Sequence, residues 1–191
     1  MTIDHDEELA RRAAGGDHEA FRELVTRYQD RVYTLARRFG NSRLDAEDVT
    51  QDTFLRAWRA LKRFRGDSRL STWLYRIASR RAWDVAAGRR SLDASEMALD
   101  EEITVARATV DADSPVVSAA ERLRVERVIA DLTPMQRAVV TLFYYQDQSV
   151  KEVALVLGLP EGTVKTHLYR ARATLRRQLE RLESHRKRGA N

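Results

Sequence analysis

The sequence has 191 residues, of which 43% are hydrophobic and 33% are charged, with only 8 Gly and 3 Pro. This balance predicts an all-α protein with modest helical cores, and it argues against a β-sandwich or a disordered chain. The lack of Cys excludes disulfides, thiolate nucleophiles and Cys-based zinc sites.

Charge divides the sequence into three segments. Residues 1–87 carry 17 Lys and Arg against 14 Asp and Glu, residues 88–118 carry 3 against 7, and residues 119–191 carry 14 against 8. Two basic blocks therefore flank an acidic one. Arg clustered on predicted helices is typical of nucleic-acid-binding proteins, although many basic proteins bind no nucleic acid.

The apolar runs and the start of the sequence predict a cytoplasmic protein. The opening MTIDHDEELARR lacks the apolar core of a signal peptide, and no apolar run approaches the roughly 20 residues that cross a bilayer. Membrane insertion is therefore not expected. The four His residues are scattered along the sequence, so we expect no metal site, and nothing indicates a cofactor.

In the first block, apolar residues recur at three- and four-residue steps behind Asp17, a good N-cap. They predict a long amphipathic helix that ends near Phe39. Similar patterns predict helices at about 45–61 and 71–87, and a short one at 7–14. We therefore interpret residues 1–87 as a helical bundle.

The predicted helix at 45–61 has an unusual outward face, on which acidic residues surround one exposed Leu. Such a face suits docking to a basic protein partner, although solvation alone would explain it about as well. The residues assigned to docking are Asp48, Gln51, Asp52, Leu55 and Arg59.

A short loop precedes the helix at 71–87. It combines an aromatic ring, hydrogen-bond donors, an acceptor and a flexible glycine, enough to build a pocket around one flipped base. A plain connection between helices is the alternative. The loop residues are Phe64, Arg65, Gly66, Asp67 and Ser68.

The helix at 71–87 has a predicted core stripe of Leu74, Ile77, Ala78, Ala82 and Val85. Its opposite face carries Trp73, Arg76, Arg80 and Trp83. Aromatic rings interleaved with Arg suit unpaired bases, because a base can stack on an indole while the charge holds its phosphate. The alternative is packing of the indoles against a neighbouring helix, which is favoured for Trp73 and evenly balanced for Trp83.

Residues 88–118 contain few large side chains and no sustained period, which predicts an acidic linker. The second block, residues 119–191, has predicted helices at about 116–131, 134–145, 149–157 and 161–183. Two of them open on capping boxes, Thr133-x-x-Gln136 and Ser149-x-x-Glu152.

The last two predicted helices have the layout of a helix-turn-helix. Gly158 is placed to end the first in a left-handed conformation, and Pro160 opens a longer basic helix. The inward stripe of this basic helix is Val164, Leu168, Ala171, Leu175 and Leu179. A solvated charged face on a structural helix is the alternative to DNA binding.

Four residues turn outward near the amino end of the basic helix and are the base-reading candidates: Lys165, Thr166, Tyr169 and Arg170. His167 and Arg172 fall on the flanks of the apolar stripe. From there, side chains reach phosphates more easily than base edges.

Taken together, these segments resemble the extracytoplasmic-function (ECF) sigma factors of the sigma-70 family, over nearly the whole chain and in the same order. DAEDVTQDTFLRAWRAL followed by FRGDSRLSTWLYRIA is similar to the family's polymerase-binding and promoter-melting segment. LTPMQRAVV with LGLPEGTVKTHLYRARATLR is similar to its fourth conserved domain. The combination is far more specific than a helix-turn-helix alone.

The resemblance implies a non-enzymatic protein, without catalytic residues, that directs RNA polymerase to promoters. The first block would bind the clamp helices of the largest polymerase subunit and capture the unwound −10 element. The second would bind the flap of the second-largest subunit and read the −35 element as duplex. An anti-sigma factor is a further candidate partner.

The resemblance also places the base-capturing loop on residues 64–68 and the recognition helix on residues 163–172. Many members have Asn where this sequence has Arg80, so their −10 base preference does not transfer. The acidic linker replaces a larger central domain of the major sigma factors. In the polymerase it would thread the positively charged RNA path, although an inert tether would have the same composition.

Two other classes of protein fit the sequence less well. A transcriptional activator or response regulator would need a sensor or receiver, and residues 1–87 show no alternation of strands and helices. An enzyme acting on DNA would need a nucleophile or a metal-binding carboxylate cluster. Asp45, Glu47, Asp48 and Asp52 do cluster, but without His or a Gly-rich phosphate loop.

Overall fold

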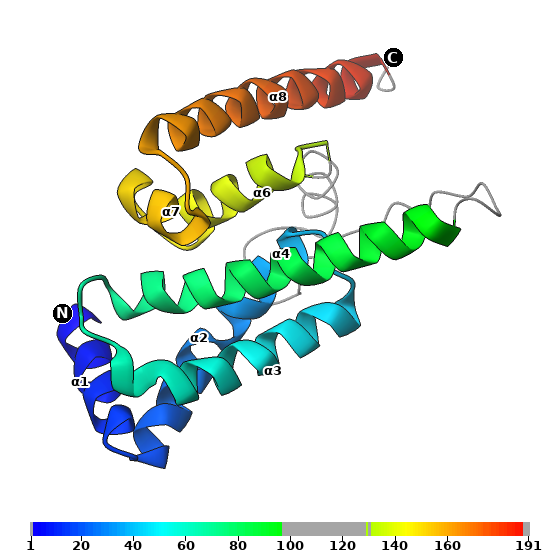
Figure 1. Cartoon of the computed structure of the whole chain (residues 1–191). Coiled ribbons are helices and arrows are strands. Elements are labelled where there is room, and N and C mark those ends of the chain that lie inside the picture. The colour runs from blue at the N-terminus through cyan, green and yellow to red at the C-terminus, as the bar shows by residue number, and fades with distance from the viewer. Residues whose placement is uncertain (1, 97–128, 130, 189–191) are drawn as a thin grey trace.

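The computed structural model describes residues 2–96, 129 and 131–188, and their regular structure is entirely helical. Helices α1–α4 form one group and α6–α8 a second. Helix α4 is the member of the first group that faces the second (Figure 1). The elements are α1 (Thr2–Ala14), α2 (His18–Arg38), α3 (Arg43–Ala60), η1 (Leu61–Arg63), α4 (Leu70–Glu96), α6 (Pro134–Val140), η2 (Thr141–Tyr145), α7 (Val150–Leu157) and α8 (Glu161–Arg188).

Local capping determines where the first long helices begin. Asp17 caps α2, because its Oδ1 accepts hydrogen bonds from the backbone N–H groups of Glu19 and Ala20, at 3.0 Å each. Ser42 and Asp45 form a capping box that starts α3 two residues earlier than the periodicity predicts. The Asp45 carboxylate therefore caps the start of α3.

Helix α4 is longer than expected, since it continues nine residues beyond position 87 into the predicted linker. The remainder of that linker, residues 97–118, lies outside the described residues. Of the predicted core stripe, Leu74, Ala78 and Ala82 are buried, whereas Ile77 and Val85 are only partly buried. Tyr75 is fully buried, which the helical wheel of an isolated bundle does not predict.

The second group of helices follows its predicted capping signals closely. Thr133 and Ser149 both form complete capping boxes, and Gly158 ends α7 with φ 68°, in the left-handed region. The predicted helix at 134–145 divides into α6 and a single π-helical turn, η2. Of the helix predicted at 116–131, the structure describes only positions 129 and 131, of which 129 is helical and 131 is in a turn.

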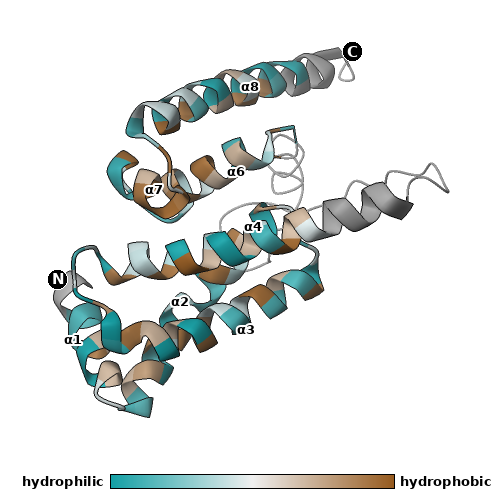
Figure 2. Ribbon diagram, in the orientation of Figure 1, coloured by the Kyte–Doolittle hydropathy of each residue, from teal (hydrophilic) through white to brown (hydrophobic). Residues whose placement is uncertain are grey.

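The two groups share one buried apolar cluster, because α7 packs directly on α4. Val139, Leu142, Val153 and Val164 of the second group belong to the same cluster as Leu35, Ala46 and Leu74 of the first. Hydrophobic residues dominate α7, whereas α1 is largely hydrophilic (Figure 2). The described halves therefore form one packed body.

Candidate nucleic-acid interface

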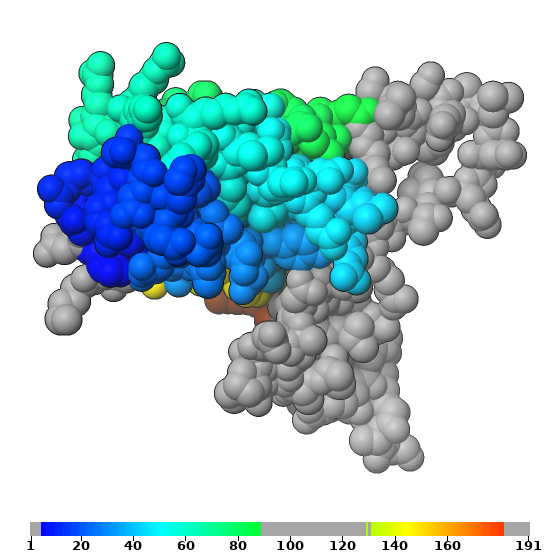
Figure 3. Space-filling view, turned by 90° about the horizontal axis from the view of Figure 1, so that it is seen from below, coloured from blue at the N-terminus to red at the C-terminus, as the bar shows by residue number. Residues whose placement is uncertain are grey.

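The loop between η1 and α4 bends at Gly66, whose φ of 74° suits glycine best. Arg65, Gly66 and Asp67 are exposed, and Ser68 is partly buried. Phe64 is not free: its ring packs on Trp73, with ring centroids 5.3 Å apart. The Trp73 ring therefore packs on a residue of the loop, and its role in DNA binding stays a prediction. The segment joining α3 to α4 stands out at one edge of the molecule (Figure 3).

The outward face of α4 holds two exposed guanidinium groups between two indoles. Arg76 and Arg80 are exposed, and neither has an ion-pair partner among the residues that the structure describes. Trp83 is partly buried and meets Phe39 edge to face, with centroids 5.8 Å apart. The spacing of three, four and three residues places all four side chains on one helix face.

Helix α8 presents the predicted base-reading residues to solvent. Lys165, Thr166, Tyr169 and Arg170 are all exposed, and Tyr169 is 75% accessible. The Thr166 hydroxyl donates to the backbone carbonyl of Gly162 at 2.9 Å, so its methyl group is the freer part.

The predicted inward stripe of α8 is buried only in the first half of the helix. Val164, Leu168 and Ala171 are buried and Leu175 is partly buried, but Leu179 is half exposed. The prediction for Leu179 is therefore wrong, because the packing partners of α8 are the short helices α6 and α7, which its far end extends beyond.

The two flanking residues of α8 differ in environment. Arg172 donates from Nε to the Tyr144 hydroxyl at 2.7 Å, and its guanidinium also lies 5.7 Å from the centre of the Tyr144 ring. This contact fixes the direction of Arg172. His167 is partly buried, and its Nδ1 lacks a hydrogen-bond partner among the described atoms.

The docking face on α3 is only partly available to a partner. Asp48, Gln51 and Arg59 are exposed, and Leu55 is 51% accessible. Asp52 instead pairs with Arg56 at 3.0 Å and, across to α4, with Arg81 at 2.7 Å. Its hydrogen bond to Arg56, together with the charges of both arginines, holds the pKa of Asp52 below its usual value. Asp52 therefore tethers two helices.

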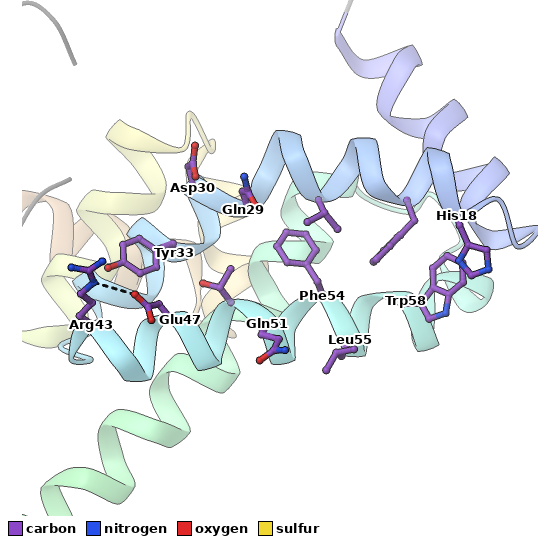
Figure 4. Close-up of a pocket in the computed structure, with 13 residues that line it drawn as sticks. His18, Gln29, Asp30, Tyr33, Arg43, Glu47, Gln51, Phe54, Leu55 and Trp58 are labelled. Atoms are coloured by element: carbon purple, nitrogen blue, oxygen red, sulfur yellow. Dashed lines mark hydrogen bonds and ion pairs between the residues drawn. The ribbon is translucent and has the colours of Figure 1, made fainter. Parts of the chain in front are cut away.

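A groove of about 770 Å³ runs between α2 and α3 beside this face (Figure 4). Gln51 and Leu55 line it from the predicted docking set. Its apolar wall comes from residues outside the predicted docking set: Phe21, Val25, Phe54 and Trp58. A helical wheel of α3 alone does not predict this groove, because α2 supplies half of the lining residues.

Two family models match the chain. Residues 24–91 match "Sigma-70 region 2" and residues 122–175 match "Sigma-70, region 4". The RNA polymerase sigma-H factor of Pseudomonas aeruginosa is 36% identical over 188 residues, which cover 95% of this chain and 97% of that protein. The chain belongs to the ECF sigma factors. It therefore directs promoter-specific transcription initiation by core RNA polymerase.

Further relatives agree with this assignment. The ECF RNA polymerase sigma-E factor of Escherichia coli strain K12 is 37% identical over 183 residues, covering 93% of this sigma factor and 95% of the relative. The solved structure of CnrH, in complex with the cytosolic domain of CnrY, has a TM-score of 0.68 and 32% identity, with coverage of 92% and 97%. RpoE of Bartonella quintana, in complex with the anti-sigma factor NepR, has the same fold, with a TM-score of 0.69, 22% identity and coverage of 84% and 96%.

The described part of the sigma factor shows no cluster of three or more His, Asp or Glu side chains that could hold a metal ion. Across the same residues, every helix is too short or too polar to span a membrane. The activator and DNA-enzyme interpretations do not account for matches to both sigma regions.

Proposed function

We propose that this sigma factor captures the unwound −10 element with the loop at residues 64–68 and the outward face of α4. The observation that carries the proposal is the pair of exposed guanidinium groups on Arg76 and Arg80, set between partly buried indoles on one helix face. Exposed Arg without internal partners is available to phosphates, and aromatic rings are stacking surfaces for bases.

Phe64 and Trp73 act as one unit in this proposal. Because the two rings pack on each other, they form a wall at the base of the loop. Arg65, Asp67 and Ser68 supply donors and acceptors around it, and Gly66 lets the backbone turn tightly. A base extruded from the duplex would enter between this wall and the polar groups.

In the same proposal, α8 reads the −35 element in the major groove. Lys165, Thr166, Tyr169 and Arg170 face base edges, since they are exposed at the amino end of the helix. Arg172, which donates a hydrogen bond to Tyr144, contacts a phosphate. His167 contacts a second phosphate.

Polymerase docking is proposed for Asp48, Gln51, Leu55 and Arg59 together with the adjoining groove. An apolar groove beside acidic and basic side chains suits the clamp helices of the largest subunit, and the second half would bind the flap. Since the neighbours CnrH and RpoE are solved with CnrY and the anti-sigma factor NepR, an anti-sigma factor is proposed as a competing partner.

We further propose that the protein is non-enzymatic and works in the cytoplasm, where its partner polymerase works. The acidic segment at 88–118 would thread the RNA path of the polymerase. Run-off transcription with core polymerase on a genomic library tests the proposal directly. Transcripts that start at shared −10 and −35 sequences are expected. A protein that binds core polymerase but yields no specific starts would contradict it.

A further inference from the structure

A short turn joins α2 to α3 and meets α4 beside the proposed −10 face. Phe39 ends α2, Gly40 follows with φ 94°, and Asn41 precedes the capping box of α3. Phe39 and Asn41 are each only 2% exposed. Glycine adopts the conformation of Gly40 without strain, so the chain reverses between two buried residues. Residues 39–41 are here called the α2–α3 turn.

Both buried residues of the α2–α3 turn contact α4, at two consecutive positions. The Asn41 side-chain amide donates to the backbone carbonyl of Ala82 at 3.1 Å and to that of Ala36, in α2, at 2.9 Å. The Phe39 ring meets the Trp83 ring at 89°, with ring centroids 5.8 Å apart. One amide group therefore joins α2 to α4, and the Trp83 indole lies against the same turn.

A further contact holds the preceding residue of α4. Arg81 pairs with Asp52 of α3 at 2.7 Å. Residues 81, 82 and 83 are thus each held from α3 or the α2–α3 turn, whereas the side chain of Arg80 is exposed to solvent. The held segment directly follows this exposed guanidinium. These contacts therefore set the rotation of α4 about its axis, and with it the direction of the proposed −10 face.

The buried amide of Asn41 also carries an unpaired atom. Its Oδ1 lacks a hydrogen-bond partner among the atoms that the structure describes, and an unpaired buried acceptor is destabilising. An apolar side chain would avoid this penalty, but it could not donate to the two carbonyls. Buried polar groups of this kind can specify how elements are set relative to one another. We therefore interpret Asn41 as a residue that fixes the register between α2 and α4.

The edge-to-face contact holds Trp83 without covering both faces of its indole. In such a pair, either the phenyl edge lies against one indole face or the indole edge lies against the phenyl face. At least one indole face stays clear of Phe39 in both cases. A binding group must be held within roughly 0.5 Å and 10–20° of its productive geometry by the residues that support it. The α2–α3 turn supplies this support for Trp83.

We propose that Phe39 and Asn41 are positioning residues for the −10 site, which set the rotation of α4 and hold the Trp83 indole in the orientation that stacks on an unpaired base. This rests on the proposed function, because it assumes that Trp83 stacks on a base. Phe39 and Asn41 do not contact DNA themselves, since both are buried. They act through Trp83 and its neighbours on α4.

Phe39→Leu tests the aromatic contact, because it keeps an apolar side chain in the core and removes the ring. Holoenzyme with this variant should melt duplex promoters about two- to tenfold more slowly, measured by permanganate footprinting. In a Trp83→Ala background the same substitution should cause no further slowing, since the residue through which Phe39 acts is gone. Leu24→Val is the control, because Leu24 is buried in α2 roughly 22 Å away along the helix axis. It should melt promoters at the wild-type rate.

The outcomes separate the positioning role from the proposed function. Wild-type melting by Phe39→Leu, with slow melting by Trp83→Ala, would overturn the positioning role alone. Slowing by Phe39→Leu that persists in the Trp83→Ala background would also overturn it, because the effect would then be a general loss of packing. Wild-type melting by Trp83→Ala would instead show that Trp83 does not stack on a base, and the proposed function of this residue would be wrong together with the positioning role.

Asn41→Ala tests the amide bridge in the free protein. Labelling with fluorotryptophan gives one fluorine NMR resonance for each of the three Trp residues, and Trp83→Phe assigns that of Trp83. Asn41→Ala should shift or split the Trp83 resonance and leave the other two in place. Thr53→Val is the matched control, because it removes a buried hydroxyl that donates to a carbonyl of its own helix, at Val49. An unchanged Trp83 resonance in folded Asn41→Ala would overturn the role of the amide.

Discussion

Arginines in this protein divide into those with internal partners and those available to a ligand. Arg81 pairs with Asp52 and Arg172 with Tyr144, whereas Arg76 and Arg80 extend into solvent. An internal partner gives a side chain a fixed direction and a structural role. A solvated guanidinium can exchange water for a phosphate or a base edge at little cost.

Arg170→Ala and Lys165→Ala test base reading by α8. Each should cost about 1–3 kcal/mol in promoter binding by the holoenzyme if the side chain contacts a base edge. The loss should vary with the −35 sequence when binding is measured across base substitutions. An equal loss on every sequence, with a shallower dependence on salt, would show a phosphate contact instead.

Asp48→Lys combined with Leu55→Ala should weaken holoenzyme formation at least tenfold, because both side chains are exposed beside the groove. Binding to core polymerase by titration with a labelled sigma factor measures this. Thr26→Ala, on an exposed position of α2 outside the groove, is the control. Wild-type affinity in the folded double variant would show that the docking assignment is wrong.

Asp52→Asn should instead change the pH dependence of stability. The folded-state pKa of Asp52 is lowered, so its stabilising effect is present above the ordinary Asp pKa and is lost as pH falls through the folded value. The melting temperatures of wild type and variant should therefore differ near neutral pH and converge in acid. A difference in melting temperature that persists at low pH would contradict a stabilising role for the Asp52 carboxylate.

Residue roles were predictable from the sequence where one helix decides them. The outward positions of Arg76 and Lys165 follow from the periodicity of their own helices. The tether at Asp52 and the burial of Tyr75 depend on contacts with other elements, α4 for Asp52 and the loop between η2 and α7 for Tyr75. No pattern within a single helix contains that information.

At the scale of the elements, the helix starts that carry a capping signal were predicted well, and helix lengths less well. Asp17, Thr133 and Ser149 cap helices as predicted, because capping is a local hydrogen-bonding effect. Helix α4 runs past its apolar stripe into a polar segment, where periodicity gives no signal. The groove between α2 and α3 needed two helices and was missed.

Gly158→Ala tests the turn of the helix-turn-helix. A Cβ in this left-handed conformation should lower the free energy of unfolding by about 1–2 kcal/mol, measured by urea denaturation. Gly162→Ala is the matched control, since it lies within α8 with open space around an added Cβ. It should be neutral or stabilising. Equal effects of the two changes would contradict the account of the turn.

At the scale of the whole molecule, the two halves carry different proposed tasks, one at the −10 element and one at the −35 element. The sequence predicts both modules, since each has its own motifs. It does not predict their packing, because Gln146 and Gln148 look like ordinary loop residues until Thr72 and Tyr75 are placed beside them. In the proposed function, the first half separates the strands at the −10 element.

Permanganate footprinting of unpaired thymines measures this strand separation. On duplex promoters, holoenzyme with Phe64→Ala or Trp83→Ala should melt the −10 element more slowly, because stacking on an aromatic ring contributes about 1–3 kcal/mol per base. A template with a mismatched bubble should restore part of the reactivity. Arg80→Ala should also change the preferred −10 base, tested with all four bases at each position. Wild-type melting by both aromatic variants, with an unchanged base preference for Arg80→Ala, would contradict the account.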